Sequence, residues 1–257
     1  IAEHKIQSSS LCVSWDGTGY GQDHQVWGGE FYSFENQKLK RIGSLRPFAL
    51  LGGEMAAKEP RRVAFSLIMT EFGSLDHLPI ENYSAEERIV FAQMFQNNLQ
   101  TTTSVGRLCE GVSSLLGLRH FNEFEAQSAM ELEFSAEKNR VTRGYSFQFH
   151  KEESSHFYWN WGPALREMLS DLKAFSDQSL MASKFFHGMA QSLVQICKRL
   201  GYKNLVLGGG VFQNKVLVEA IAAECQSQKI QVFFPQAFPA NDGGIALGQA
   251  YSLSVKN

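Results

Sequence analysis

The chain has few cysteines, little net charge and no long apolar run. Its 257 residues include four cysteines, no two of which form a Cys-x-x-Cys pair, so their spacing indicates no disulfide framework. Each lies in an apolar neighbourhood. We therefore expect all four to be buried and reduced, as in a cytoplasmic protein: Cys12, Cys109, Cys197 and Cys225.

The charge balance excludes further classes of partner. A net charge of −2 without a basic stripe indicates neither a nucleic acid nor an acidic membrane surface. No run of eighteen apolar residues occurs, so we expect no membrane-spanning helix. With 44% hydrophobic and 19% charged residues, the composition is that of an ordinary globular protein that can bury a core.

The start of the chain suggests a piece of a larger protein. There is no initiator methionine, and Ile1 to Ile6 reads like the continuation of a preceding segment. We expect a fragment of a multidomain protein.

Apolar periodicity and turn residues predict an α/β order of elements. A β-meander opens the chain, and Asp16-Gly-Thr-Gly-Tyr-Gly21 reads as a glycine-rich turn within it. Pro60 starts a helix, and Ser84-Ala-Glu-Glu87 forms a capping box before another. A βαβα pattern closes the chain, as is typical of a two-lobed α/β protein with a cleft at its strand ends. The predicted strands are 11–15, 26–34, 39–45, 204–208 and 230–234, with more in 141–159, and further helices are 105–116, 162–175, 179–200, 212–225 and 242–254.

Two glycine-rich segments near the end carry the chemistry. The apolar run before Gly208-Gly-Gly-Val-Phe-Gln-Asn214 stops at three glycines, and a helix begins at an amide side chain. Glycine lets the main chain approach a phosphate or ribose, and a helix N-terminus favours negative charge. Asn241-Asp-Gly-Gly244 repeats the arrangement with a carboxylate. The pair predicts a nucleotide-and-metal cleft, although tight connections in an ordinary sheet would give similar glycines.

Seven motifs occur in one order along nearly the whole chain: Asp16-Gly-Thr-Gly-Tyr-Gly21, Trp27-Gly-Gly-Glu-Phe31, Leu45-Arg-Pro-Phe48, Gly52-Gly-Glu-Met-Ala-Ala-Lys-Glu-Pro60, Thr103-Ser-Val-Gly-Arg-Leu108, Gly208 to Asn214 and Asn241 to Ala250. This set resembles the C-terminal, TsaD-like transferase domain of the [NiFe]-hydrogenase maturation carbamoyltransferases, the HypF family. The resemblance implies a two-lobed, actin-like and Hsp70-like ATPase fold of the ribonuclease H type. In that fold, 1–100 would be the remainder of an N-terminal lobe truncated at its start, and 101–257 the C-terminal lobe.

The resemblance also implies a reaction. An upstream domain would make carbamoyl-adenylate with ATP, and this domain would pass the carbamoyl group to the C-terminal cysteine thiol of the partner HypE. Two alternatives stay open: O-carbamoyl transfer to a small hydroxyl compound, and a non-catalytic docking domain. A tRNA-modifying role is disfavoured because the chain has no basic stripe.

Several residues match the nucleotide-binding positions of the family. The first phosphate-binding turn would comprise Asp16, Gly17, Thr18, Gly19 and Tyr20, although Asp-Gly is also a strong signal for a plain hairpin turn. Gly209, Gly210 and Asn214 would meet the nucleotide, Asn214 being otherwise an exposed residue early in a helix. Arg107 would pair with the adenylate phosphate or be a solvated helix residue.

The chain departs from the family pattern at two of these positions and at the metal. Glu110 replaces the Asp that holds ribose hydroxyls, and Ala126 replaces a Gly where the backbone approaches the ligand. Asp242 matches the aspartate that binds a divalent metal (iron, zinc or magnesium) or caps the last helix. The family's two metal-binding histidines precede this segment, and His4 has no HxxxH or HxH partner. We therefore expect weak metal binding or none.

Overall fold

A computed structural model of the chain describes residues 1–21, 23, 25–97, 100–137, 141–151, 156–174 and 177–255. Its strands are β1 (Ser10–Tyr20), β2 (Val26–Glu35), β3 (Lys38–Leu45), β4 (Phe48–Ala49), β5 (Thr101–Thr102), β6 (Gln148–Lys151), β7 (Phe157–Asn160), β8 (Asn204–Gly208) and β9 (Gln231–Phe233). Its α-helices are α1 (Met55–Lys58), α2 (Pro60–Phe72), α3 (Ala85–Asn97), α4 (Val105–Leu115), α5 (Gln127–Ala136), α6 (Gly162–Lys173), α7 (Gln178–Arg199), α8 (Lys215–Gln228) and α9 (Ile245–Val255). Short 3₁₀ turns are η1 (Ile80–Asn82), η2 (Gly210–Gln213) and η3 (Asp242–Gly244).

One mixed sheet organises the molecule, with the strand order β6-β7-β3-β2-β1-β8-β9. The meander β1-β2-β3 is antiparallel, whereas β8 lies parallel to β1 and β9 parallel to β8. Two parallel neighbours require helical crossovers, which α7 and α8 supply. The carboxyl ends of β1 and β8 consequently meet at one edge of the sheet.

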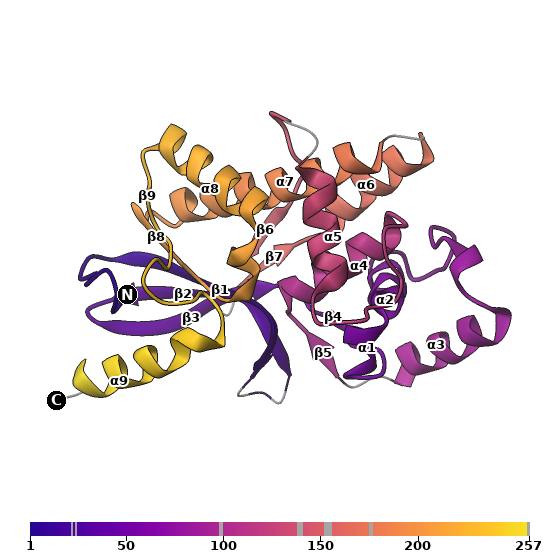
Figure 1. Cartoon of the computed structure of the whole chain (residues 1–257), viewed down its shortest axis with the longest axis horizontal. Helices are drawn as coiled ribbons and strands as arrows, with labels where there is room; N and C mark the ends of the chain where they lie inside the picture. The colour runs from indigo at the N-terminus through magenta and orange to yellow at the C-terminus, as the bar shows by residue number, and fades with distance from the viewer. Residues whose placement is uncertain are drawn as a thin grey trace.

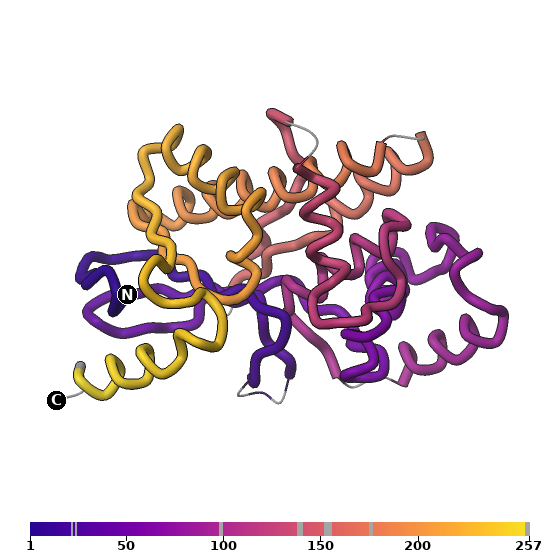
Figure 2. Tube along the Cα trace, in the orientation of Figure 1, coloured from indigo at the N-terminus to yellow at the C-terminus, as the bar shows by residue number. Residues whose placement is uncertain are grey.

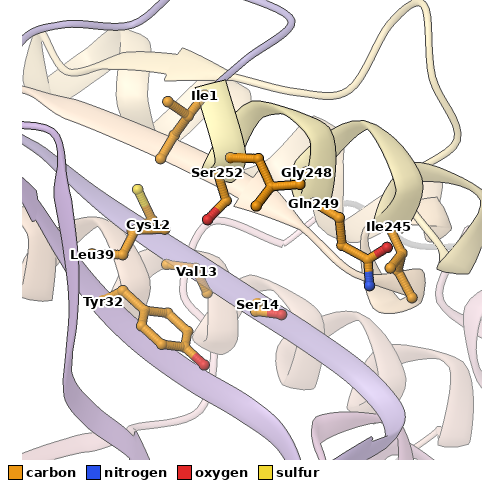
Figure 3. A pocket seen from close by; sticks show the side chains of 11 residues that line it. Ile1, Cys12, Val13, Ser14, Tyr32, Leu39, Ile245, Gly248, Gln249 and Ser252 are labelled. Carbon is orange, nitrogen blue, oxygen red and sulfur yellow. The ribbon is translucent and has the colours of Figure 1, made fainter. Parts of the chain in front are cut away.

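Helices lie on both faces of this sheet (Figure 1). α7 and α8 run across one face, and α9 lies beside the other, near the N-terminus. The trace in Figure 2 shows the ends of β1 and β2 projecting from the sheet as a hairpin. An open, largely apolar groove of about 990 Å³ separates α9 from β1 and β2, with Cys12 and Tyr32 on its floor (Figure 3). None of the described helices is both long and apolar enough to span a membrane.

Aromatic stacking joins the two ends of the chain. Trp15 of β1 has no exposed surface, and its ring stacks on Trp159 at 4.6 Å and on Phe212 at 5.2 Å between centroids. Burying such rings contributes a few kcal/mol each, roughly in proportion to their apolar area. Since Phe212 lies in η2, this stack holds the turn after β8 against β1.

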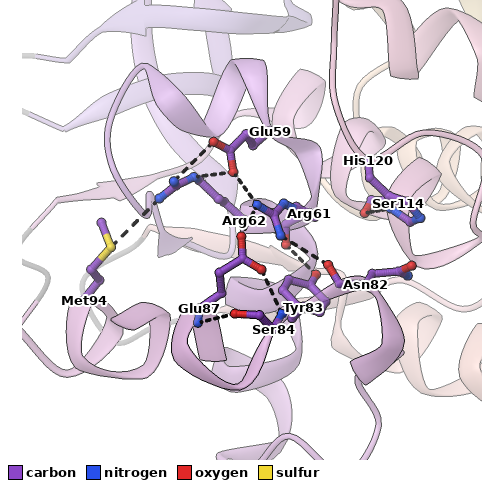
Figure 4. Close-up of polar contacts among 10 residues, drawn as sticks. All are labelled: Glu59, Arg61, Arg62, Asn82, Tyr83, Ser84, Glu87, Met94, Ser114 and His120. Atoms are coloured by element: carbon purple, nitrogen blue, oxygen red, sulfur yellow. Dashed lines mark hydrogen bonds and ion pairs between the residues drawn. The ribbon is translucent and has the colours of Figure 1, made fainter. Parts of the chain in front are cut away.

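The predicted helix signals are confirmed. Ser84 and Glu87 form a reciprocal capping box, with N–H to side-chain oxygen distances of 2.9 and 3.1 Å, and Pro60 is the first residue of α2. Arg61 and Arg62 of α2 contact Glu87 and Met94 of α3 in the polar cluster drawn in Figure 4, and these contacts hold α3 against α2. The helix predicted over 212–225 begins three residues later, at Lys215, because η2 precedes it.

Other expectations need correction or extension. The segment read as a glycine-rich turn continues β1 to Tyr20, and the chain reverses only after Gly21. α5 was not predicted from the sequence, because its residues lack a clear apolar stripe. Strands from both sides of the predicted boundary after residue 100 pair in the same sheet. The division into 1–100 and 101–257 stays a prediction.

All four cysteines are free and buried, as expected.

Candidate functional site

Asp16 joins β1 to the turn after β8. The pairing of β1 with β2 changes register between Trp15 and Gly19, so the strand is irregular at this point. The Asp16 carboxylate accepts the N–H of Gly17 at 2.7 Å and the N–H of Gly210 at 3.2 Å. Two glycine-containing segments that are 194 positions apart in the sequence therefore meet at one carboxylate.

Gly209 allows the turn after β8 to lie against β1. Its φ is 106°, and a Cβ atom there would lie 2.1 Å from the carbonyl oxygen of Trp15. Only glycine fits both the backbone conformation and the space. The Gly209 N–H donates to the carbonyl of Ala240 at 2.8 Å. The segment that carries Asp242 is thereby held beside the same turn.

The first turn of α4 forms a platform under Asp16 and Gly17. Ser104 is the N-cap of α4, and its hydroxyl oxygen accepts the Arg107 N–H at 3.0 Å. The same hydroxyl lies 2.8 Å from the carbonyl oxygens of Asp16 and Gly17. A Cβ on Gly106 would come within 2.8 Å of the Gly17 Cα, so two glycines make this close crossing possible.

Arg107 and Glu110 form a buried pair below that crossing. They are 5% and 1% exposed, and Arg107 Nη1 lies 2.9 Å from Glu110 Oε2 without the alignment of a hydrogen bond. Arg107 is therefore not the solvated helix residue that the sequence left open. A Cβ added to Gly17 would lie 3.1 Å from Arg107 Nη2, which places the guanidinium directly beneath that glycine.

Burial controls the ionisation of Glu110. Loss of hydration raises the pKa of its carboxyl to about 8, Arg107 opposes that rise, and the charge of Glu125 adds to it. Among the described residues, Arg107 Nε, Arg107 Nη1 and Glu110 Oε2 have no hydrogen-bond partner. Buried polar groups are normally paired, so this pair retains unused hydrogen-bonding capacity.

Asn214 and Ala126 begin the two helices that flank this region. Asn214 is half-buried and caps α8, its Oδ1 accepting the Leu217 N–H at 2.8 Å. The capping bond occupies the oxygen and leaves the Nδ2 amide group as the part that can meet a ligand. Ala126 precedes α5 with φ 59° and ψ 12°, a left-handed conformation that favours glycine. The backbone N–H of Lys215 donates to Glu133 at 2.7 Å, which joins α8 to α5.

The other residues predicted for the first phosphate turn lie farther along β1, away from the turn after β8 and the start of α4. Thr18 is exposed, Gly19 faces the Trp27 carbonyl across the hairpin, and Tyr20 is 87% exposed. The structure therefore brings Asp16 and Gly17 to the turn after β8 and to the first turn of α4. Tyr20 lies farther out, on the projecting hairpin.

Asp242 lies at the start of η3, before α9, and its side chain is exposed. The N-cap residue is its neighbour Asn241, whose Oδ1 accepts the Gly243 N–H at 3.1 Å. Within the described ranges, no three His, Cys, Asp or Glu residues gather as metal ligands would. Asp242 alone does not fit the four-ligand site that a transition metal requires. We assign no step to a metal.

Several histidines lie within hydrogen-bonding distance of protein groups. His120 lies 2.9 Å from the Ser114 hydroxyl, and His4 lies 2.7 Å from the Phe234 carbonyl. His24 lies outside the described residues.

Sequence reasoning did not single out Ser104 or Glu30. Ser104 belongs to the Thr103-Ser-Val-Gly-Arg-Leu108 motif, and the preference of serine for N-cap positions was the available signal. Glu30 belongs to the Trp-Gly-Gly-Glu motif, but only the fold shows that its side chain is buried.

Comparisons with known proteins match nearly the whole chain. The family model "Carbamoyltransferase, Kae1-like Domain, second subdomain" covers residues 12–249. Carbamoyltransferase HypF of Synechocystis sp. is 30% identical over 97% of this chain and 35% of the relative. Carbamoyltransferase HypF of Rhizobium leguminosarum bv. viciae is 29% identical over 99% of this chain and 33% of the relative. The chain thus spans about a third of the length of these relatives.

Two solved structures of HypF proteins resemble this chain in fold. A crystal structure of full-length HypF in the phosphate- and nucleotide-bound form superposes with a TM-score of 0.86 at 29% identity, covering 96% of this chain and 33% of that one. HypF of T. kodakarensis, at 21% identity and a TM-score of 0.78, shares the fold. The predicted α/β fold of the actin-like, ribonuclease H type is confirmed. The chain belongs to the HypF family of carbamoyltransferases, in the part described as the second subdomain of the Kae1-like domain.

Proposed function

We propose that this domain binds carbamoyl-adenylate where β1, the turn after β8 and the start of α4 converge. It then passes the carbamoyl group to the C-terminal cysteine of HypE, in the cytoplasm, during synthesis of the cyanide ligands of [NiFe]-hydrogenase. An upstream domain of the longer protein would make the adenylate with ATP. The relatives' names support carbamoyl transfer, and one solved relative is described as phosphate- and nucleotide-bound.

The observation that carries the proposal is the buried guanidinium of Arg107. Its Nη2 lies beneath Gly17 at the N-terminal turn of α4, while Nε and Nη1 have no hydrogen-bond partner in the described part of the chain, Nη1 lying 2.9 Å from Glu110 Oε2. Planar guanidinium groups suit phosphate oxygens, and a helix N-terminus favours the same charge. The adenylate phosphate would lie here. Glu110 pairs with the guanidinium from the buried side.

The nucleoside would extend toward the starts of α5 and α8. Asn214 offers its Nδ2 amide group there, and the left-handed turn at Ala126 presents backbone rather than a long side chain. Gly209 and Gly210 keep the turn after β8 free of side chains. These residues fit a nucleotide because they combine hydrogen-bond donors with space for close approach.

The chemistry would use the acceptor's own thiolate. That sulfur attacks the carbamoyl carbon, a C–S bond forms, the bond from the carbamoyl carbon to the phosphate oxygen breaks, and AMP leaves with the electron pair. The domain would contribute orientation and charge stabilisation. Burial raises the pKa of Cys12 and Cys225 to about 11 and that of Cys197 to about 12. It raises that of Cys109 as well. These thiols are therefore protonated at neutral pH and are poor nucleophiles.

Titration calorimetry with ADP and magnesium tests the site. We expect binding, and a loss of about tenfold or more in affinity for Arg107→Ala, since a hydrogen bond to a charged group is lost. Asn214→Ala should weaken ADP and adenosine alike. An unfolding curve of each variant, measured under the conditions of the titration, shows whether the variant is folded as wild type is.

Absence of ADP binding to folded protein would contradict the proposed site and favour the docking alternative. Transfer of a carbamoyl group from synthetic carbamoyl-adenylate to a small hydroxyl compound, but not to HypE, would favour O-carbamoyl transfer.

A further inference from the structure

Glu30 is a buried carboxylate that the proposed reaction does not use. It lies on β2 in the Trp27-Gly-Gly-Glu motif, and its side chain is 3% exposed. One oxygen accepts the N–H groups of Gly28 and Gly29 at 2.7 and 2.8 Å. The other accepts the Thr103 hydroxyl at 2.5 Å and an N–H of Arg41 at 3.4 Å. Four donors therefore converge on one side chain.

Three of these donors, Gly28, Gly29 and Thr103, belong to the segments that enclose the start of α4. Thr103 immediately precedes the N-cap Ser104, and its backbone N–H donates to the Val26 carbonyl at 3.0 Å. A Cβ on Gly28 would lie 2.5 Å from the Asp16 carbonyl oxygen and 3.0 Å from the Ser104 Cα. β2 thus packs directly between the irregular part of β1 and the N-cap of α4.

We infer that Glu30 is a positioning residue that fixes the N-cap of α4 against the Asp16–Gly17 segment, and thereby sets the geometry of the phosphate-binding backbone. This inference rests on the proposed function. Only a carboxylate can accept four hydrogen bonds without presenting a donor of its own. Burial raises the pKa of Glu30, and Thr103, the two glycine N–H groups and Arg41 act against that rise.

The chain offers a matched control in Glu71. Its side chain is also 3% exposed, and it pairs with Arg46 and Arg166. Neither arginine belongs to the candidate site. Glu30→Gln and Glu71→Gln each replace a buried acceptor-only group by an amide of the same shape, so a comparison of the two separates positioning from general loss of stability.

Amide hydrogen exchange on the free protein is the first readout. Glu30→Gln should speed exchange in residues 16–19 and 103–107 relative to wild type, whereas Glu71→Gln should leave these segments unchanged. The second readout is affinity for ADP and for adenosine. Glu30→Gln should weaken ADP by about tenfold while adenosine changes little, because the phosphate part of the site is displaced.

Equal exchange in both variants over 16–19 and 103–107 would overturn the inference, as would an equal loss of ADP affinity. If wild type binds no ADP, the proposed function fails, and the exchange comparison still decides the role of Glu30. Should Glu30→Gln not fold, Thr103→Val removes one donor with little change of volume. The same local exchange is then expected, and unchanged exchange would overturn the inference.

Discussion

Two arginines in this chain are equally buried and differently used. Arg61 of α2 is 7% exposed and Arg107 of α4 is 5% exposed. Arg61 donates to Glu87 at 2.5 Å, to Glu59 at 3.2 Å and to the carbonyl of Asn82 at 3.2 Å (Figure 4). Its guanidinium also lies 4.6 Å from the centre of the Phe121 ring. Protein groups surround this cation, and only its Nε lacks a hydrogen bond within the described residues.

Arg107 has one close carboxyl partner, Glu110, and two nitrogens without a hydrogen bond in the part of the chain that the structure describes. It lies beneath a strand with glycine at the point of contact, whereas Arg61 lies beneath aromatic rings. Burial and residue type are alike, so the difference lies in the neighbours. An arginine whose donors are taken by the protein stabilises the fold, and one with donors to spare can bind an anion.

At a fixed pH, the largest expected effect on stability concerns the Arg61 cluster. Arg61→Ala should lower the free energy of unfolding by about 2–3 kcal/mol, because it removes the ionic, hydrogen-bonding and cation–π contacts of a guanidinium that is only 7% exposed. Urea unfolding measures this loss. ADP affinity should stay within twofold of wild type in conditions where the variant is folded. A loss of ADP affinity as large as that of Arg107→Ala would remove the distinction between the two arginines.

The pH dependence of the two paired carboxylates should differ. Arg61 holds the pKa of Glu87 at about 2, whereas burial raises that of Glu110 from 4.5 to about 8. Between pH 4.5 and about 8, the folded protein keeps the Glu110 proton that the unfolded chain has lost, so the native state binds more protons than the unfolded state. Stability therefore falls as pH rises from about 4.5 to about 8, by at most about 1.4 kcal/mol per pH unit for this one group.

Glu110→Gln should flatten that slope, and Glu87→Gln should leave it unchanged, since Glu87 stays ionised throughout the window. Thermal or urea unfolding at pH 5, 6, 7 and 8 provides the measurement. An identical slope in wild type and Glu110→Gln would show that Glu110 is ionised in the folded protein across this range.

The smallest effect concerns backbone strain beside the site. Ala126→Gly should raise the free energy of unfolding by about 0.5–1 kcal/mol, because glycine adopts the left-handed conformation without the Cβ penalty. Lys229, at the end of α8 with φ 56°, is the matched control, and Lys229→Gly should stabilise similarly. A lower melting temperature for Ala126→Gly alone would mean that the alanine methyl packs usefully at this turn.

The sequence predicted the elements with strong local signals and missed those without them. The capping box, the proline at the start of α2 and the apolar run of β8 each act within a few residues, so α2, α3 and β8 were found. α5 has no clear apolar stripe because it packs between α4 and α7 at positions that the local pattern does not mark. The extension of β1 to Tyr20 was not predicted, because pairing with β2, rather than the local strand propensity of Asp-Gly-Thr-Gly, keeps this segment extended.

The sequence by itself determined the family, the order of the glycine motifs and the candidate positions Asp16, Arg107, Asn214 and Asp242, because motif spacing and capping preferences are local properties of the chain. Only the tertiary structure decided how these positions are used. Arg107 and Glu110 are buried together because α4 starts beneath β1, and Glu30 gathers four donors because β2 passes beside the N-cap of α4. Burial and hydrogen-bond partners depend on residues far apart in the sequence, and folding alone brings them together.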